Sequence, residues 1–192
     1  MSSRSNILAA VLANQPDNSP LPDVSIFNDL YTSEDAVERF IATAMGIGSS
    51  VHRVAGIDEI NKVISERFTH GPVVSNLSGI NNALAVDDDN YHAADVELSV
   101  FKVRLAVAEN GALWLTEEDI QKRVLPFICQ HLALVVNAAN IVGSMHQAYE
   151  RIGNARYNYG TFISGPSKTA DIEQSLVLGA HGPRSLTVFI ID

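Results

Sequence analysis

The chain has 192 residues, of which 46% are hydrophobic and 18% charged, and its formal net charge at pH 7 is −9. A chain of this length can bury one sizeable core, so we do not expect a second full domain. The negative charge argues against a nucleic-acid surface, because phosphate binding requires clustered lysine and arginine side chains. No apolar run approaches the roughly 20 residues that a helix needs to cross a bilayer.

The lone cysteine, Cys129, follows the apolar pair Phe127 and Ile128. A single cysteine cannot form an internal disulfide, and this context predicts a buried, reduced thiol. We therefore expect a cytoplasmic protein. The six histidines are scattered, with no two at metal-ligand spacing on one helix, so we expect no metal site.

Residues 1–31 are predicted to form an N-terminal helix and an irregular arm, followed by a single α/β domain over residues 32–192. An apolar stretch at residues 7–13 predicts a short amphipathic helix with Ser5 as its cap. Residues 14–31 are rich in Pro, Asp, Asn and Ser, which is typical of irregular connections.

Strands and helices then alternate along the first half of the predicted domain. Apolar residues at helical spacing predict helices over residues 35–44 and from Asp58 onward. Short apolar runs predict strands at residues 51–55 and 73–75. This order is typical of a parallel sheet.

Apolar runs on both sides of Asn110 and Gly111 predict a β-hairpin. Asn-Gly is the strongest short hairpin signal, and a two-residue turn would place Glu109 opposite Ala112. We expect the hairpin to be largely buried, with its tip exposed.

Residues 132–136 read as a buried strand. Apolar residues at three-and-four spacing from Ala138 to Ile152 then predict an amphipathic helix, with Gly153 as its C-cap.

A further helix is predicted after the breaker cluster Ser-Gly-Pro at residues 164–166. Ser167 or Thr169 can serve as its N-cap. Asp171 and Glu173 put negative charge in the first turn, where the helix dipole favours it.

Gly179 would end this helix, and a second turn at residues 181–184 leads to an almost unbroken apolar run at residues 186–191. Such a run is typical of a strand that is buried on both faces. With the short apolar run at residues 161–163, this stretch predicts a parallel βαβ unit.

Two of these segments, Ser-Gly-Pro-Ser-Lys-Thr-Ala-Asp-Ile-Glu at residues 164–173 and Gly-Ala-His-Gly-Pro-Arg-Ser-Leu at residues 179–186, resemble the C-terminal signature of a known family. This family is the LUD-domain proteins of the LutC/YkgG type, named for lactate utilisation. A third match is residues 108–112, where the family usually has a Thr-Gly-Thr-like turn after an acidic residue. The resemblance implies a Rossmann-like α/β fold, with a mostly parallel sheet, flanking helices and a β-hairpin insertion, similar to the NagB/RpiA/CoA transferase-like fold.

The resemblance also implies a non-redox subunit that acts with iron–sulfur partner proteins in the oxidation of L-lactate to pyruvate. That reaction removes a hydride equivalent, which side chains alone cannot accept. The chain has neither a cysteine cluster nor a Gly-x-Gly-x-x-Gly loop. We therefore expect no cofactor in this chain and iron–sulfur clusters only on its partners.

Ligands of open parallel sheets collect at the carboxyl ends of the strands, and the two C-terminal turns are expected to meet there. The residues expected to bind a carboxylate or another anion are Gly165, Ser167, Lys168, Thr169, His181 and Arg184. The residues expected to shape the surrounding motif are Asn110, Gly111, Pro166, Asp171, Glu173, Gly182 and Pro183. An equally open interpretation is that these residues cap a helix and hold the two turns together without any ligand.

Glu109 at the hairpin tip is the candidate catalytic residue. It could serve as a base or covalent carboxylate in a free-standing isomerase or coenzyme A transferase-like enzyme, which is the alternative to the accessory subunit. It could also be a solvated turn residue, because shared fold is only analogy.

Overall fold

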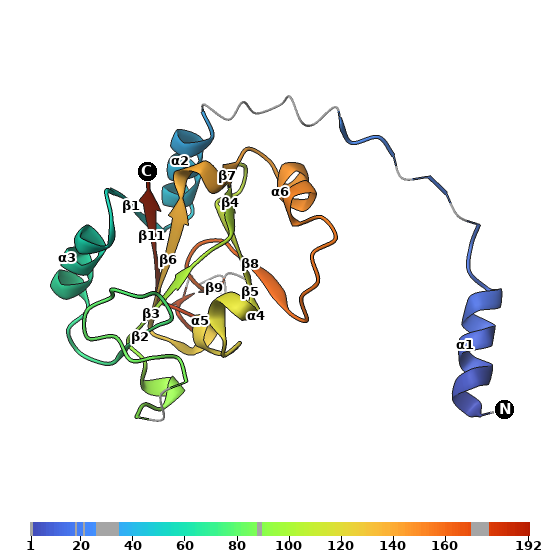
Figure 1. Ribbon diagram of the computed structural model, residues 1–192, viewed down its shortest axis with the longest axis horizontal. Helices are drawn as coiled ribbons and strands as arrows, with labels where there is room; N and C mark the ends of the chain where they lie inside the picture. Colours follow the sequence, from blue (N-terminus) through green and yellow to red (C-terminus); the bar gives the residue numbers. More distant parts are fainter. Residues whose placement is uncertain (1, 18, 21, 26–34, 88–89, 170–176) are drawn as a thin grey trace.

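The computed structural model describes residues 2–17, 19–20, 22–25, 35–87, 90–169 and 177–192. Helix α1 (Ser3–Ala13) stands apart from an α/β body (Figure 1), and none of its residues is buried. Its cap is Ser2 rather than the predicted Ser5, because Ser2 Oγ accepts a hydrogen bond from the Ser5 N–H at 3.3 Å.

The body is built on a five-stranded sheet in which every strand is parallel to its neighbours. Its strands, in spatial order, are β1 (Ser50–Val54), β11 (Ser185–Ile191), β6 (His131–Asn137), β3 (Leu98–Lys102) and β2 (Val73–Ser75). The predicted strands at residues 51–55, 73–75, 132–136 and 186–191 are all present. The pattern analysis missed β3, which lies between β6 and β2.

A second sheet of four strands packs against the first. Its strands, in spatial order, are β7 (Ile141–Val142), β4 (Leu105–Val107), β5 (Ala112–Thr116) and β8 (Gly160–Ile163). Strand β7 is parallel to β4, and the other pairs are antiparallel.

The predicted hairpin is the pair β4 and β5, but its turn is longer than expected. Val107 pairs with Ala112, so residues 108–111 form the loop and the register differs by two residues from the prediction. Because side chains alternate with a period of two, this shift leaves every side chain on its expected face. The Asn110 side-chain oxygen accepts the Ala112 N–H at 3.1 Å, and Gly111 has a φ of +67°.

Helices cover the two sheets. The longer ones are α2 (Ala36–Gly46), α3 (Ile57–Arg67) and α6 (Met145–Ile152). The short ones are η2 (Ala93–Asp95), α4 (Glu117–Ile120), α5 (Leu125–Ile128) and η3 (Ala138–Asn140). Helix α3 covers one face of the parallel sheet, and the four-stranded sheet with α2 covers the other. The expected α/β fold, with a mostly parallel central sheet and flanking helices, is confirmed.

The helix predicted from Ala138 to Ile152 is wrong in its first half. That half is η3 followed by β7, which pairs with β4. The α-helix begins only after Ser144, whose Oγ accepts the Gln147 N–H at 3.3 Å while the Gln147 side chain bonds back to the cap. This capping box stops the helix from extending backward, and Gly153 is its C-cap as predicted.

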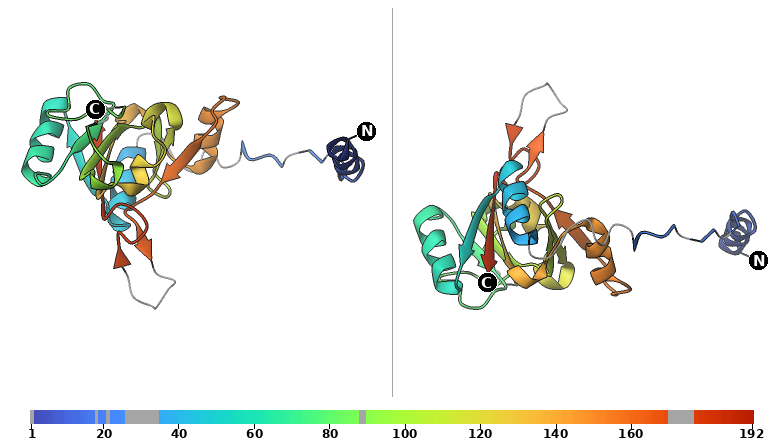
Figure 2. Two further views of the ribbon diagram at one scale, coloured as in Figure 1. Left: turned by 90° about the horizontal axis from the view of Figure 1, so that it is seen from below. Right: turned by 90° about the horizontal axis from the view of Figure 1, so that it is seen from above.

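The predicted C-terminal βαβ unit is also wrong. Strand β8 belongs to the four-stranded sheet, whereas β11 belongs to the parallel one. Between them, β9 (Lys168–Thr169) and β10 (Val177–Leu178) pair antiparallel in a hairpin that projects from the body (Figure 2). No helix begins at Ser167 or Thr169, because the Ser167 carbonyl accepts the Gly179 N–H across the hairpin. The remainder of the predicted helix, with Asp171 and Glu173, lies outside the described residues.

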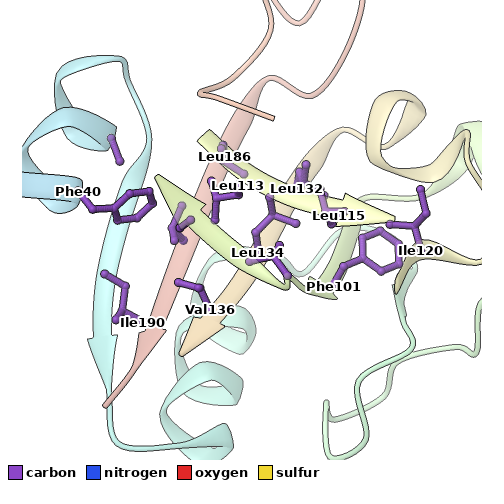
Figure 3. Close-up of a cluster of buried hydrophobic side chains, with 14 of the residues drawn as sticks. Phe40, Phe101, Leu113, Leu115, Ile120, Leu132, Leu134, Val136, Leu186 and Ile190 are labelled. Carbon is purple, nitrogen blue, oxygen red and sulfur yellow. The ribbon is translucent and has the colours of Figure 1, made fainter. Parts of the chain in front are cut away.

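The largest core cluster lies between the two sheets (Figure 3). Alternate residues of β5, Leu113 and Leu115, point into it and meet Leu132 and Leu134 of β6. Phe40 of α2 closes the cluster at one end. Each of these side chains is at most 1% exposed.

Gly160, the first residue of β8, is required by its close contact with Trp114. A methyl group at Gly160 would overlap the Trp114 ring, lying 2.6 Å from its Cζ2 atom. We expect Gly160→Ala to lower the free energy of unfolding by about 1–3 kcal/mol, measured by urea denaturation. Gly46→Ala is the control, because nothing lies within 4 Å of the added methyl group; it should be neutral or stabilising by up to about 1 kcal/mol. Equal stability of the two variants would contradict this account.

Candidate functional site

The two C-terminal turns of the predicted site lie side by side. The Ser167 N–H donates to the Pro183 carbonyl at 2.9 Å, and Gly182 packs closely on Ser167. Pro183 is buried and Gly182 is partly buried, whereas His181 and Arg184 are exposed. Hydroxyl, imidazole and guanidinium groups therefore belong to one small region of the surface.

This region lies at the edge of the parallel sheet opposite to the one predicted. The turn leads into the amino end of β11, and the Arg184 N–H donates to the carbonyl of Gln130, just before β6 begins. Both strands run away from it. The expectation that the turns meet at the carboxyl ends was wrong because it assumed a βαβ unit, in which residues 164–169 would follow a strand of the parallel sheet.

Several of the predicted binding residues hold the body together. The Lys168 ammonium donates to the carbonyl of Ile47, the C-cap of α2, where the helix dipole favours a positive charge. Gly165 has a φ of +75°, and a methyl group there would lie 3.2 Å from the same carbonyl oxygen. Ser164 Oγ donates to the Asn110 carbonyl at 2.7 Å. The loop is thereby bound to α2 and to the tip of the β4–β5 hairpin.

The other two residues of this loop, Pro166 and Thr169, are held by packing and by strand pairing. Pro166 is partly buried beside Gly48, 3.6 Å from a methyl group added there. Thr169 lies in β9, opposite Val177.

Glu109 is exposed at the hairpin tip, but its carboxylate has a partner. One oxygen accepts the Met145 N–H at 2.9 Å, at the first residue of α6, and the Glu109 N–H donates to the Gly143 carbonyl at 3.1 Å. A carboxylate at a helix N-terminus satisfies an otherwise unpaired amide and complements the helix dipole. Glu109 therefore joins the hairpin to α6.

His131 is a polar residue of the turn region that pattern analysis did not single out. His131 is the first residue of β6. Its Nδ1 atom lies 2.7 Å from the Oγ atom of Ser185, the residue that follows Arg184. Burial lowers the pKa of His131; Glu97 opposes this effect and Arg184 adds to it. The lowered pKa favours the neutral form of the ring.

A crevice of about 480 Å³ opens at the carboxyl ends of the parallel strands. Its lining residues follow or end strands β2, β3 and β6 or belong to α4, and they are Asn76, Leu77, Lys102, Val103, Arg104, Glu118, Asp119 and Asn140. This is where open α/β sheets place their ligands. The signal in the sequence is a polar residue after each strand, and it was missed because β3 was not predicted.

Charges in this crevice are largely paired. Arg104 donates to Asp119 at 2.7 Å and to Glu118 at 2.6 Å, and these contacts, that with Asp119 foremost, raise the pKa of Arg104. The Asp119 carboxylate also accepts both the N–H and the hydroxyl of Thr116. Lys102 is exposed and forms no ion pair with any residue that the structure describes.

Comparison of the sequence with models of known families identifies one that matches this chain. The family model described as the LUD domain matches residues 82–191, which is more than half of the chain. The chain belongs to the LUD domain family. Both C-terminal segments that carried the resemblance lie within the matched range, and the identification is confirmed.

Proteins similar to this LUD domain chain include two named Lactate utilization protein C. The one from Bacillus pumilus is 32% identical over 118 residues, which are 58% of this chain and 49% of that protein. The one from Shouchella clausii is 33% identical over 104 residues, which are 52% of this chain and 44% of that protein. The chain thus spans about half the length of these relatives.

A crystal structure of a DUF162 family protein from Deinococcus radiodurans has a similar fold. The TM-score is 0.63 with 18% sequence identity, and the match covers 84% of this chain and 99% of that one. In the LUD domain chain, none of the helices within the described ranges is both long and apolar enough to span a bilayer. Likewise, no group of three or more His, Cys, Asp or Glu residues in those ranges could hold a metal ion.

If Glu109 holds α6, Glu109→Ala should lower the free energy of unfolding by about 0.5–2 kcal/mol, as loss of a helix cap does. Urea denaturation measures this change. Glu66→Ala is the matched control, because Glu66 is exposed near the end of α3 and should change stability by less than about 0.5 kcal/mol. A Glu109 variant as stable as the control would show that the contact is not structural.

Cys129 is buried, and burial raises the pKa of its thiol to about 11. The thiolate is the nucleophile and the metal ligand, so the native protein should react slowly with a thiol reagent at pH 8. Reaction in urea should be fast and should involve one thiol per chain. Rapid modification of the native protein would contradict the burial of Cys129.

Proposed function

We propose that this chain takes part in lactate utilisation, as a subunit that has no redox centre of its own and works with iron–sulfur partner proteins in the conversion of L-lactate to pyruvate. The observation that carries the proposal is the match of more than half of the chain to the LUD domain family, with relatives named Lactate utilization protein C. Those relatives are about twice as long as the regions that match this chain. Their name therefore supports a shared process, lactate utilisation, for this chain.

The chemistry of lactate oxidation explains why partners are needed. Conversion to pyruvate removes two electrons, which require a redox group. These 192 residues contain one cysteine, whose thiol is buried and has a raised pKa, whereas iron–sulfur clusters are held mainly by several cysteine thiolates. The clusters of the proposed system therefore belong to other chains.

We place the substrate carboxylate at the two C-terminal turns. Arg184 is exposed and forms no ion pair within the described ranges, so its guanidinium is available for a bidentate contact with a carboxylate. His181 is exposed in the same turn, and Ser167 lies against it through Gly182. These three residues supply the cationic and hydroxyl groups of the proposed site.

The alternative function, a free-standing isomerase or coenzyme A transferase-like enzyme, depends on a free carboxylate at Glu109. The hydrogen bond to the Met145 N–H uses one of its oxygens and supports a structural role. This contact favours the accessory subunit over the enzyme.

Arg184→Ala should weaken the binding of lactate or pyruvate at least about tenfold in isothermal titration calorimetry, because it removes a charge-assisted contact. Arg4→Ala, in the exposed helix α1, is the control and should bind as the wild type does. Equal affinity in the Arg184 variant and the control would exclude this site.

The subunit role is tested separately, with the purified iron–sulfur partners. Lactate-dependent reduction of a dye by those partners should require the wild-type chain and should fall when Arg184→Ala replaces it. Full activity of the partners without this chain would contradict the proposal.

A further inference from the structure

A cavity of about 240 Å³ lies on the outer face of the four-stranded sheet, away from the C-terminal turns. Leu105 and Trp114, which pair across β4 and β5, form its apolar floor. Ile152 at the end of α6 and Tyr157 in the loop to β8 form its walls.

The cavity follows from how this face of the sheet is covered. Helix α6 packs on Leu105 and Trp114 through Ala148 and Ile152, and it ends at Gly153. The following loop returns over Trp114. There the ring of Tyr157 meets the indole edge-on, with the ring centroids 5.3 Å apart. Trp114 is 7% exposed and Tyr157 is 40% exposed, so the aromatic wall is open to a ligand while the floor is nearly closed.

The rim of the cavity has more positive than negative charge. The rim residues Arg104 and Glu118 form an ion pair with each other. Arg156 is exposed and makes no ion pair or hydrogen bond with any part of the chain that the structure describes. Among the residues that the structure describes, the Arg151 guanidinium has one long hydrogen bond, of 3.4 Å, to the Ala139 carbonyl. Two guanidinium groups of the cavity lining are therefore free of ion pairs within the described residues.

Asn140 adds an uncharged donor and acceptor at the same opening. Its side chain is partly buried and lines both this cavity and the carboxyl-edge crevice. Its amide forms no hydrogen bond within the described ranges, so it is available to a ligand in the cavity.

We propose that this cavity binds a small anion with one planar ring system, such as an aromatic carboxylate or a nucleoside monophosphate. The ring packs against the exposed ring of Tyr157, above the nearly closed floor, and the carboxylate or phosphate is held by Arg156 and Arg151. Arginine suits this role because its planar guanidinium forms paired hydrogen bonds with either group. The volume, below the range of roughly 300–1,000 Å³ that is usual for larger ligands, favours a small occupant with one planar ring system.

This inference goes beyond the proposed function and shares no residue with it. Ser167, His181 and Arg184 do not line the cavity. Binding here can thus be measured whether or not the carboxylate site at the C-terminal turns is confirmed.

The chain offers a direct reporter, because Trp114 is its one tryptophan and forms the cavity floor. We would titrate the full chain with adenosine monophosphate, phenylpyruvate, adenosine and inorganic phosphate while following tryptophan fluorescence, and confirm affinities by calorimetry. At least one ring anion should change the fluorescence saturably, and adenosine should bind at least about tenfold more weakly than adenosine monophosphate if the latter binds. Binding of only one ring anion identifies phosphate or carboxylate as the preferred group.

Arg156→Gln should weaken the binding of the ring anion about tenfold or more, and Arg4→Gln should not change it. Tyr157→Ala should also weaken binding, through loss of the aromatic wall, and urea denaturation will confirm that both cavity variants are folded. Arg184→Ala should leave binding at the cavity unchanged. The proposal is overturned if neither ring anion binds, if adenosine binds as tightly as adenosine monophosphate, or if Arg156→Gln binds as the wild type does.

Discussion

The packing of the four-stranded sheet against the parallel sheet is the contact on which the rest of the structure depends. Leu113 and Leu115 of β5 enter the shared core, so the intervening residue, Trp114, must point to the opposite face. That face needs its own cover, which α6 and the loop to β8 provide. Residue 160 must be a glycine because the Trp114 ring occupies the space that a side chain at this position would need. The outer cavity is thus a consequence of the inner packing.

Polar residues of the family signature serve two different purposes. Glu109, Ser164 and Lys168 use their side chains to join the hairpin tip, α6, the Ser-Gly-Pro loop and the end of α2. These contacts link segments that are far apart in the sequence, which explains their value to the fold without any ligand. His181 and Arg184 are different, because their exposed side chains form no hydrogen bond or ion pair with the residues that the structure describes.

The segment from β1 to α3, which precedes the matched range, is integrated with the part that matches the family. Strand β1 precedes the matched range, yet all five of its residues pair with β11 near the C-terminus. Helix α3 covers the same sheet through Ile60 and Ile64. Segments on both sides of the start of the matched range therefore build one parallel sheet, in agreement with a structural similarity that extends beyond the sequence match.

Local sequence patterns determined the elements whose cause is local: the buried strands β2, β6 and β11, the helices α2 and α3, and the hairpin at Asn110 and Gly111. Apolar periodicity and turn residues are sufficient there, because they act over a few neighbouring positions. Only the tertiary structure decided that β8 and β11 belong to different sheets, and that residues 168–169 pair as a strand. Those outcomes depend on hydrogen bonds between segments that are distant in the sequence, such as that of Ser167 with Pro183. The edge at which the two C-terminal turns meet followed from those choices, and no periodicity in the chain encodes it.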